Sequence, residues 1–523
     1  MRILKNLLTA TISLILFFGG LELGFRTFAS ERNRTYFEEQ TERGLGTPVP
    51  QKEPGEYRIF VFGGSAAYGF PVADRYSITA WLRKSFPLLL PGRKVRVVNC
   101  GWPGKGSHHV VEGVRNITKY QPDLLIIYSG HNDFPTANRL YADNWLYRLN
   151  LHLIFRSTFY RFLDNRMNRV RKKIVYGKSG YPEKYYREEI IAKKFYKKVG
   201  VNDEEDKQIF RRHFLNLEDV IRWAKGKGVD VLFLSLASNV HEIPPAASTN
   251  SPRLSLEGRT RWDQWFQGGQ VHQREKHFAE ALRAYQEAAK IDPTYADLQY
   301  RLGIDYEATG DYEAAKKAYL LARDYDRSPT RAKSRMNENI RELTKKYGLI
   351  FVDVVSSFEK LSPHGIITGD LIYDDVHPSI KAQQIIVDEI LHALAEKGKI
   401  APSTEWRWQA LETAREDPAQ NGEWKIDGHL NAYRYLLRGL HLWGQGDYAD
   451  CVVDLEKGLE LMPKLIEMYA FLGDAYTHLQ EKGRAAKAFQ ALTEQDAALS
   501  KLLRNKYPEI QESYVQTMKA VRN

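Results

Sequence analysis

At 523 residues, the chain is too long for one compact core and is expected to contain about three domains. Its hydrophobic content of 43% and charged content of 27% are ordinary for a globular protein. The only cysteines, Cys100 and Cys451, are too few and too distant for a disulfide framework or a zinc site.

The first 28 residues form a candidate membrane anchor. Arg2 and Lys5 precede an uncharged run at 6–21, slightly shorter than the roughly 20 residues that usually span a bilayer. A cleaved signal peptide is the alternative, but charges follow the run directly and there is no clean Ala-x-Ala site. We expect an uncleaved anchor at 1–28 in the cell membrane, a polar stalk at 29–55, and an extracytoplasmic catalytic domain.

Five short apolar runs then alternate with helical patterns. The runs lie at 57–62, 94–99, 123–128, 229–236 and 349–354. Helical periodicity between them is clearest at 78–89 and 216–227. Continuously apolar strands that alternate with helices are typical of a parallel sheet covered on both faces. The sequence therefore predicts an α/β sandwich of three layers with a five-stranded parallel sheet.

A basic, aromatic insertion at 137–215 separates the third and fourth strands. Its part at 156–198 holds 14 lysines and arginines against four acidic residues, a local excess of +10, close to the +11 of the whole chain. A helical cap with a solvated basic face explains this composition, and a platform on anionic lipid near the anchor is the sharper alternative. We expect no nucleic-acid binding.

Two pairs of helical repeats are predicted from a period of 34 residues. In the insertion at 259–332, one set of positions recurs after 34 residues, and a similar set recurs in the C-terminal segment at 428–523. The matched positions are Gly269/Gly303, Phe278/Tyr312, Tyr285/Tyr319, Gly439/Gly473 and Leu455/Phe489. This period is the tetratricopeptide signature, and about three repeats are needed for a stable stack. The pairs are therefore expected to stack on each other or to dock on the α/β domain, with 401–427 as a connector.

Four strand ends supply residues suited to acyl transfer. Ser65 follows the first strand on a glycine turn that includes Gly64, which allows the backbone to approach a substrate closely. Gly101 and Asn132 follow the second and third strands, where a backbone N–H and a side-chain amide can stabilise an oxyanion. His131 adjoins Asn132, and we expect His131 and Gly64 to contact the substrate.

The fourth element is the segment from Asp374 to His377, just after the fifth strand. A carboxylate three residues ahead of an imidazole can fold back onto its Nδ1 atom, which leaves Nε2 to deprotonate a serine. The expected catalytic residues are Ser65, His377 and Asp374. The expected oxyanion donors are the backbone N–H groups of Ser65 and Gly101 and the amide of Asn132. The chemistry needs no metal and no cofactor.

These motifs resemble those of the SGNH (GDSL-like) hydrolase superfamily. The matching blocks are Phe62-Gly63-Gly64-Ser65, Asn99-Cys100-Gly101, Gly130-His131-Asn132-Asp133 and Asp374-Asp375-Val376-His377-Pro378. The resemblance implies a flavodoxin-like sandwich in two parts, 56–258 and 333–400, and gives the same residues the same roles. Two departures are Gly-Gly-Ser in place of Gly-Asp-Ser and His131 where many members have threonine.

The resulting expectation is a membrane-anchored serine esterase that cleaves or transfers acyl groups through an acyl-serine intermediate. The expected substrates are O-acyl groups on glycans or lipid esters, and the repeats are expected to bind a partner protein. Two alternatives stay open. One is an O-acyltransferase that modifies an envelope polysaccharide, and the other is a non-catalytic tetratricopeptide scaffold with an inactive SGNH domain.

Overall fold

A computed structural model describes most of the chain, in long ranges and in parts of two short segments. The described residues are 51–70, 76–134, 203–401, 424–444 and 446–522, with parts of 13–27 and of 157–167. These ranges leave out most of the expected anchor and of the expected connector. They also leave out nearly all of the stalk and nearly all of the first two thirds of the basic insertion. Among the described residues, no helix has both the length and the apolar character to span a bilayer.

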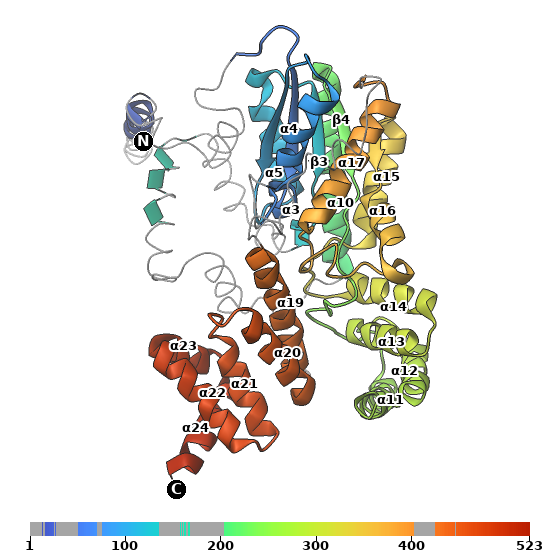
Figure 1. Ribbon diagram of the computed structural model, residues 1–523, viewed down its shortest axis with the longest axis vertical. Coiled ribbons are helices and arrows are strands. Elements are labelled where there is room, and N and C mark those ends of the chain that lie inside the picture. Colours follow the sequence, from blue (N-terminus) through green and yellow to red (C-terminus); the bar gives the residue numbers. More distant parts are fainter. Residues whose placement is uncertain are drawn as a thin grey trace, which may run out of the picture.

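The centre of the molecule is a parallel sheet of five strands (Figure 1). The strands are β1 (Tyr57–Gly63), β2 (Val95–Gly101), β3 (Leu124–Tyr128), β4 (Asp230–Leu234) and β5 (Ile350–Val352). Their order is β2-β1-β3-β4-β5, and every neighbouring pair is parallel. In this register Gly63 lies opposite both Gly101 and Tyr128, so three strands end at the same edge. The predicted five-stranded parallel sheet is confirmed.

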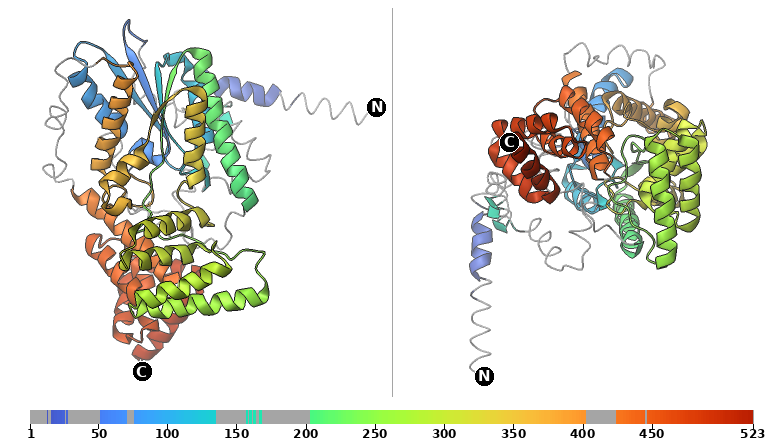
Figure 2. Two further views of the ribbon diagram at one scale, coloured as in Figure 1. Left: turned by 90° about the vertical axis from the view of Figure 1, so that its right-hand side faces the viewer. Right: turned by 90° about the horizontal axis from the view of Figure 1, so that it is seen from below.

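Helices cover both faces of the sheet, which makes three layers (Figure 2). One face is covered by α4 (Ile78–Leu89) and α17 (Ile380–Glu396), and the other by α5 (Ser107–Asn116), α10 (Asp203–Lys227) and α15 (Ser334–Tyr347). Shorter elements are α3 (Ser65–Tyr68), η2 (Thr118–Tyr120), α16 (Val354–Leu361) and η4 (Pro363–Gly365). All seven residues of β1 are buried, as expected of a strand covered on both sides.

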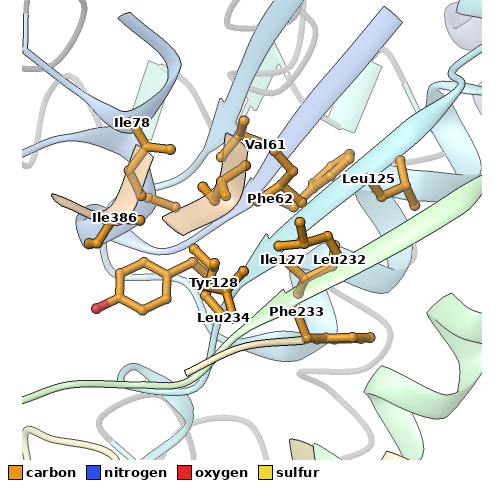
Figure 3. Close-up of a cluster of buried hydrophobic side chains, with 14 of the residues drawn as sticks. Val61, Phe62, Ile78, Leu125, Ile127, Tyr128, Leu232, Phe233, Leu234 and Ile386 are labelled. Atoms are coloured by element: carbon orange, nitrogen blue, oxygen red, sulfur yellow. The ribbon is translucent and has the colours of Figure 1, made fainter. Parts of the chain in front are cut away.

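The core lies between these layers. Figure 3 shows a cluster of buried side chains of β1, β3 and β4, among them Phe62, Ile127 and Leu232, together with Ile78 of α4 and Ile386 of α17. All five are at most 1% exposed. Burying a side chain of this size contributes about 1.5–3 kcal/mol, so the sheet is a rigid base for the loops at its edge.

The inserted repeats consist of four antiparallel helices. They are α11 (Leu256–Arg274), α12 (Phe278–Ile291), α13 (Ala296–Ala308) and α14 (Tyr312–Tyr325). A Cβ atom on Gly269 would lie 2.4 Å from the ring of Tyr285, and one on Gly303 would lie 2.6 Å from the ring of Tyr319. The repeated glycines therefore allow each helix to contact the aromatic ring of the next, as the 34-residue period predicts.

The C-terminal repeats have two further helices. Their elements are α19 (Trp424–Gly444), α20 (Tyr448–Leu461), α21 (Met468–His478), α22 (Lys482–Gln495), α23 (Ala497–Lys506) and α24 (Pro508–Arg522). Gly439 and Gly473 lie against Leu455 and Phe489 in the same way as the inserted glycines. Tyr507, which joins α23 to α24, packs its ring against Phe471. The last two helices thus pack against the same core as the C-terminal repeats.

The two sets of repeats contact each other beyond the carboxyl end of the sheet (Figure 1). Arg301 of α13 bonds to Asp297 of its own helix and to Asp447 ahead of α20, both at 2.9 Å. His441 of α19 lies 3.2 Å from Asp297. Tyr319 of α14 belongs to a buried cluster with residues of the loops that follow β4 and η4. Both expected arrangements therefore occur: the repeats stack on each other, and the inserted pair docks on the α/β domain.

Candidate active site

Ser65 occupies a tight turn between β1 and α3. A Cβ atom on Gly63 would lie 1.9 Å from the backbone oxygen of Tyr128, and one on Gly64 would lie 2.3 Å from Nδ2 of Asn132. Only glycine allows these approaches. Ser65 is consequently the first residue of α3, where backbone N–H groups have no acceptor within the helix, and its side chain is held at the edge of the sheet.

The structure brings Ser65, His377 and Asp374 into one hydrogen-bonded row. The Ser65 hydroxyl lies 2.7 Å from Nε2 of His377, and Nδ1 of the same ring lies 2.5 Å from Oδ2 of Asp374. The other oxygen of Asp374 accepts the backbone N–H groups of Val376 (2.9 Å) and His377 (2.8 Å). These two bonds fold the carboxylate back onto the imidazole, so that His377 donates from Nδ1 and can accept the serine proton at Nε2.

Opposing effects set the pKa values of the pair. Burial lowers the pKa of His377, but the negative charge and hydrogen bond of Asp374, with a smaller contribution from Asp375, outweigh it, and the net shift is upward from 6.5. Burial raises the pKa of Asp374, but the charge of His377 and three hydrogen bonds hold it below its ordinary value. Asp374 therefore stays ionised while it orients and stabilises a protonated His377.

Asp375 has a different environment from its neighbour. Burial and the charge of Asp374 raise its pKa to about 6, while His377, a hydrogen bond to Thr330 and the charge of Arg331 oppose the rise. Thr330 and Arg331 belong to the segment that leaves the inserted repeats. No sequence motif pointed to this segment as part of the site.

Asn132 and Gly101 lie at the same edge of the sheet, but their N–H groups have different acceptors. Nδ2 of Asn132 donates to the backbone oxygen of Lys105 at 3.3 Å and lies against Gly64. The N–H of Gly101 donates to Oδ1 of Asn99 at 3.0 Å, and a Cβ atom on Gly101 would lie 2.3 Å from the backbone of Tyr68. The backbone of Gly101 thus packs against α3 with its N–H already paired.

Gly104 is the glycine of this loop with an accessible backbone. It is exposed, has a φ of +73°, and lies in a turn closed by the Lys105 N–H and the Trp102 oxygen at 3.1 Å. Within the described part of the chain its N–H has no acceptor. The turn is tied to Asn132 through Lys105. The Pro103-Gly104 pair, a turn signal, could have identified this position from the sequence.

His131 is buried beside the catalytic pair, with 4% of its surface exposed. Its Nδ1 atom accepts the N–H of Ala332 at 3.3 Å, and burial, followed by the charges of His377 and Arg323, lowers its pKa to about 3. A neutral ring that accepts at Nδ1 has its proton on Nε2. That atom has no partner among the described residues, so His131 keeps one spare donor.

Two groups of described side chains have the donor types and spacing that a metal ion needs. One is Asp374, Asp375 and His377, where Asp374 and His377 already bond to each other. The other is His272, Glu275 and His277, on the turn between α11 and α12 far from Ser65 in sequence. The serine chemistry described above uses Asp374 and His377 as side chains and calls for no metal ion at either group.

Comparisons with known proteins give one family match and several similar solved structures. The tetratricopeptide repeat model matches residues 273–334. A GDSL-like lipase from Bacteroides thetaiotaomicron is 12% identical with a TM-score of 0.29, covering 70% of this chain and 98% of the lipase. The acetylxylan esterase Axe2 from Geobacillus stearothermophilus is 10% identical with a TM-score of 0.31, covering 65% and 94%.

A third solved structure, the psychrotrophic esterase EstA from a Pseudoalteromonas species, is 9% identical with a TM-score of 0.28, covering 66% of this chain and 99% of the esterase. No curated protein matches the sequence. The chain is similar to GDSL-type acylhydrolases and esterases and contains a tetratricopeptide segment.

Proposed function

We propose that this protein is a serine esterase that cleaves or transfers ester-linked acyl groups through an acyl-serine intermediate. The main support is the row of Ser65, His377 and Asp374, with separations of 2.7 and 2.5 Å. A serine next to a base, which is itself oriented by a carboxylate, is the arrangement of an activated nucleophile. A retired enzyme would have no reason to keep all three groups in hydrogen-bonding distance.

In the first half of the reaction, Oγ of Ser65 attacks the ester carbonyl carbon and its proton moves to Nε2 of His377. The carbonyl oxygen becomes an oxyanion, for which the Ser65 N–H and the Asn132 amide are the first two proposed donors. Gly104, rather than Gly101, is the proposed third donor because its N–H is unpaired in the described structure. The tetrahedral intermediate then expels the alcohol, which takes the proton from His377, and leaves acyl-Ser65.

In the second half, a hydroxyl group attacks acyl-Ser65 and gives its proton to His377. The bond between the acyl carbon and Oγ of Ser65 then breaks, and His377 returns the proton to that oxygen. Water yields hydrolysis, and a sugar hydroxyl yields transfer to a glycan. The residues that hold the acyl-enzyme are the same in both cases, so the proposal covers both outcomes. His131 contributes its spare Nε2–H to an acceptor oxygen of the substrate.

The proposed setting is a membrane surface. The basic residues Arg2 and Lys5, ahead of the uncharged run at 6–21, support an anchor in the cell membrane. An anchored enzyme meets lipid esters and O-acylated envelope glycans, which are the proposed substrates. Resistance of the full chain to extraction with alkaline carbonate would support this part, and release would contradict it.

The catalytic proposal is tested by labelling with a fluorophosphonate, which reacts with an activated serine. We expect the full chain to be labelled and the Ser65→Ala variant not to be. Conversion of a p-nitrophenyl acetate substrate should disappear in the same variant. A folded wild-type protein that neither takes up the probe nor turns over the ester would contradict the proposal and favour a scaffold.

A further inference from the structure

The loop that holds Asp374 and His377 is bonded to a carboxylate outside it, that of Glu242. Glu242 follows β4, and its Oε2 accepts the backbone N–H of Gly369 at 2.6 Å and the side-chain amide of Asn239 at 2.7 Å. Glu242 is 15% exposed, so these bonds are shielded from water. The carboxylate thus fixes the start of the segment that leads to Asp374.

Asn239 extends the same support towards the catalytic groups. Its backbone N–H donates to the oxygen of Asp375 at 3.2 Å, and its Nδ2 donates to the oxygen of Ile372 at 3.3 Å. Asn239 is fully buried, and its own backbone oxygen accepts the guanidinium of Arg331. One asparagine therefore holds both Ile372 and Asp375, one on each side of Asp374.

The C-terminal repeats complete this network through Arg434 of α19. Its Nη1 atom donates to Oε1 of Glu242 at 2.9 Å, across 192 positions of sequence, and Arg434 is also only 15% exposed. A Cβ atom on Gly369 would lie 1.6 Å from the same Nη1 atom. The absence of a side chain at Gly369 is what allows the guanidinium to reach the carboxylate.

The segment that leaves the inserted repeats also contacts this network. The segment that follows α14 places Arg331 against the oxygens of Asn239 and Ile243 and places the Ala332 N–H on His131. Both sets of repeats therefore meet at Asn239 and Glu242. The two sets are in turn joined to each other by Arg301 and Asp447.

We infer that the repeats are part of the catalytic unit, and that Arg434 is a positioning residue that acts through Glu242 and Asn239 on the Asp374–His377 loop. This inference rests on the proposed function. A positioning role of this kind matters because a displacement of about 1 Å at a catalytic group can cost about a hundredfold in rate. The C-terminal repeats are then needed for full activity even when no partner protein is present.

Arg434→Met tests the inference, because methionine keeps an apolar stem but removes the charge and the donors. We expect the second-order rate of fluorophosphonate labelling to fall about tenfold or more. Gly369→Ala should have a similar effect, since its methyl group displaces the guanidinium, and the double variant should be no slower than the slower single variant. Arg438→Met is the matched control: Arg438 lies on the same helix, but its partner is Asp454 within the repeats.

The pH profile of labelling separates positioning from a general loss of stability. Asp374 and Asp375 raise the pKa of His377, while burial lowers it, and His131 is the neighbouring imidazole. A loosened loop should move the midpoint of the profile to lower pH in Arg434→Met, and Arg434→Lys should restore part of both the rate and the midpoint. The Arg438→Met control should stay within about twofold of the wild type with an unchanged midpoint.

Two results would overturn the inference. One is an Arg434→Met protein, folded by circular dichroism, that is labelled at the wild-type rate with the wild-type midpoint. The other is an equal slowing in Arg438→Met, which would mean that any damage to the repeats has the same effect. Labelling of the wild type on Ser65 in the same experiment distinguishes either result from a failure of the proposed function, in which no variant is labelled.

Discussion

The two sides of the candidate active site are built in opposite ways. At the sheet edge, each functional group either comes just after a strand or lies within three positions of a residue that it bonds to, as Asp374 and His377 do. On the side of the repeats, the contacts cross long stretches of sequence: Ala332 meets His131 over 201 positions and Arg434 meets Glu242 over 192. Local backbone geometry supplies the chemistry, and long-range docking holds it in place.

This difference predicts different kinds of failure. Replacing a catalytic side chain at the sheet edge should remove a chemical role and leave the fold intact. A change in the repeats should act through stability or through the position of the loop, and its effect on the rate should be smaller. The predictions below test each side in turn.

The largest effect is expected from Asp374→Asn. Asparagine favours the wrong tautomer of His377, which in comparable triads costs about 10⁴ in turnover. The wild-type rate should rise with pH through a midpoint above 6.5, because His377 must lose its proton and its pKa is raised. Without Asp374, burial is opposed only by Asp375, so the midpoint should move to lower pH.

The measurement is the rate of ester hydrolysis between about pH 5 and 9, with chemistry rate-limiting. Asp375→Asn is the control, since Asp375 acts on the imidazole only through its charge in the described structure and contributes less to its pKa than Asp374 does. A rate for Asp374→Asn within tenfold of the wild type, or a flat wild-type profile, would contradict His377 as the base.

Asn132→Ala should have the next largest effect. Removing one oxyanion donor typically costs about 10²–10³ in turnover, with little change in KM. Asn250→Ala is a suitable control, because the amide of Asn250 has no partner in the described structure. Steady-state kinetics with p-nitrophenyl acetate measures both variants. An unchanged turnover number for Asn132→Ala would exclude its amide as an oxyanion donor.

On the side of the repeats, the adjacent glycines of α11 allow a matched comparison. Gly269→Ala places a methyl group 2.4 Å from the Tyr285 ring, and overpacking of this kind costs about 1–3 kcal/mol. Gly268 has open space around it, so Gly268→Ala should stabilise the helix by up to about 1 kcal/mol. Thermal unfolding should show opposite shifts. Equal shifts would mean that the close contact of Gly269 does not limit packing.

Much of the sheet edge could be predicted from sequence, because its signals are local. The helix expected at 78–89 is α4, and the apolar runs contain all or most of each strand. The helix expected at 216–227 is longer and begins at Asp203. Its first turn is acidic and shows no apolar periodicity, so the hydrophobic pattern does not reveal where the helix begins. The spacing from Asp374 to His377 predicted a contact within one turn of chain, and that contact is present.

The rest of the site had no such signal. Arg331 and Arg434 are ordinary charged residues of helical or loop segments, and only the docking of the repeats shows what they contact. The choice of Gly101 as an oxyanion donor relied on its place at a strand end. The direction of its N–H depends on Asn99, and no spacing rule contains that information.

The smallest effect on the labelling rate is expected from Asn99→Ala, which tests whether Gly101 or Gly104 donates to the oxyanion. Asn99 is buried, accepts the Gly101 N–H and donates to the Tyr68 oxygen at 3.0 Å, so its loss leaves two polar groups unpaired, at a cost of about 1–3 kcal/mol each. If Gly104 is the donor, the labelling rate of the folded variant should change by less than about threefold. If Gly101 is the donor, Asn99 either competes with the oxyanion for the Gly101 N–H or aims that N–H at the oxyanion. In both cases the removal of Asn99 should change the labelling rate by tenfold or more, upward in the first case and downward in the second. Labelling rates measured well below the melting temperature of the variant therefore distinguish the two glycines even though the substitution destabilises the protein.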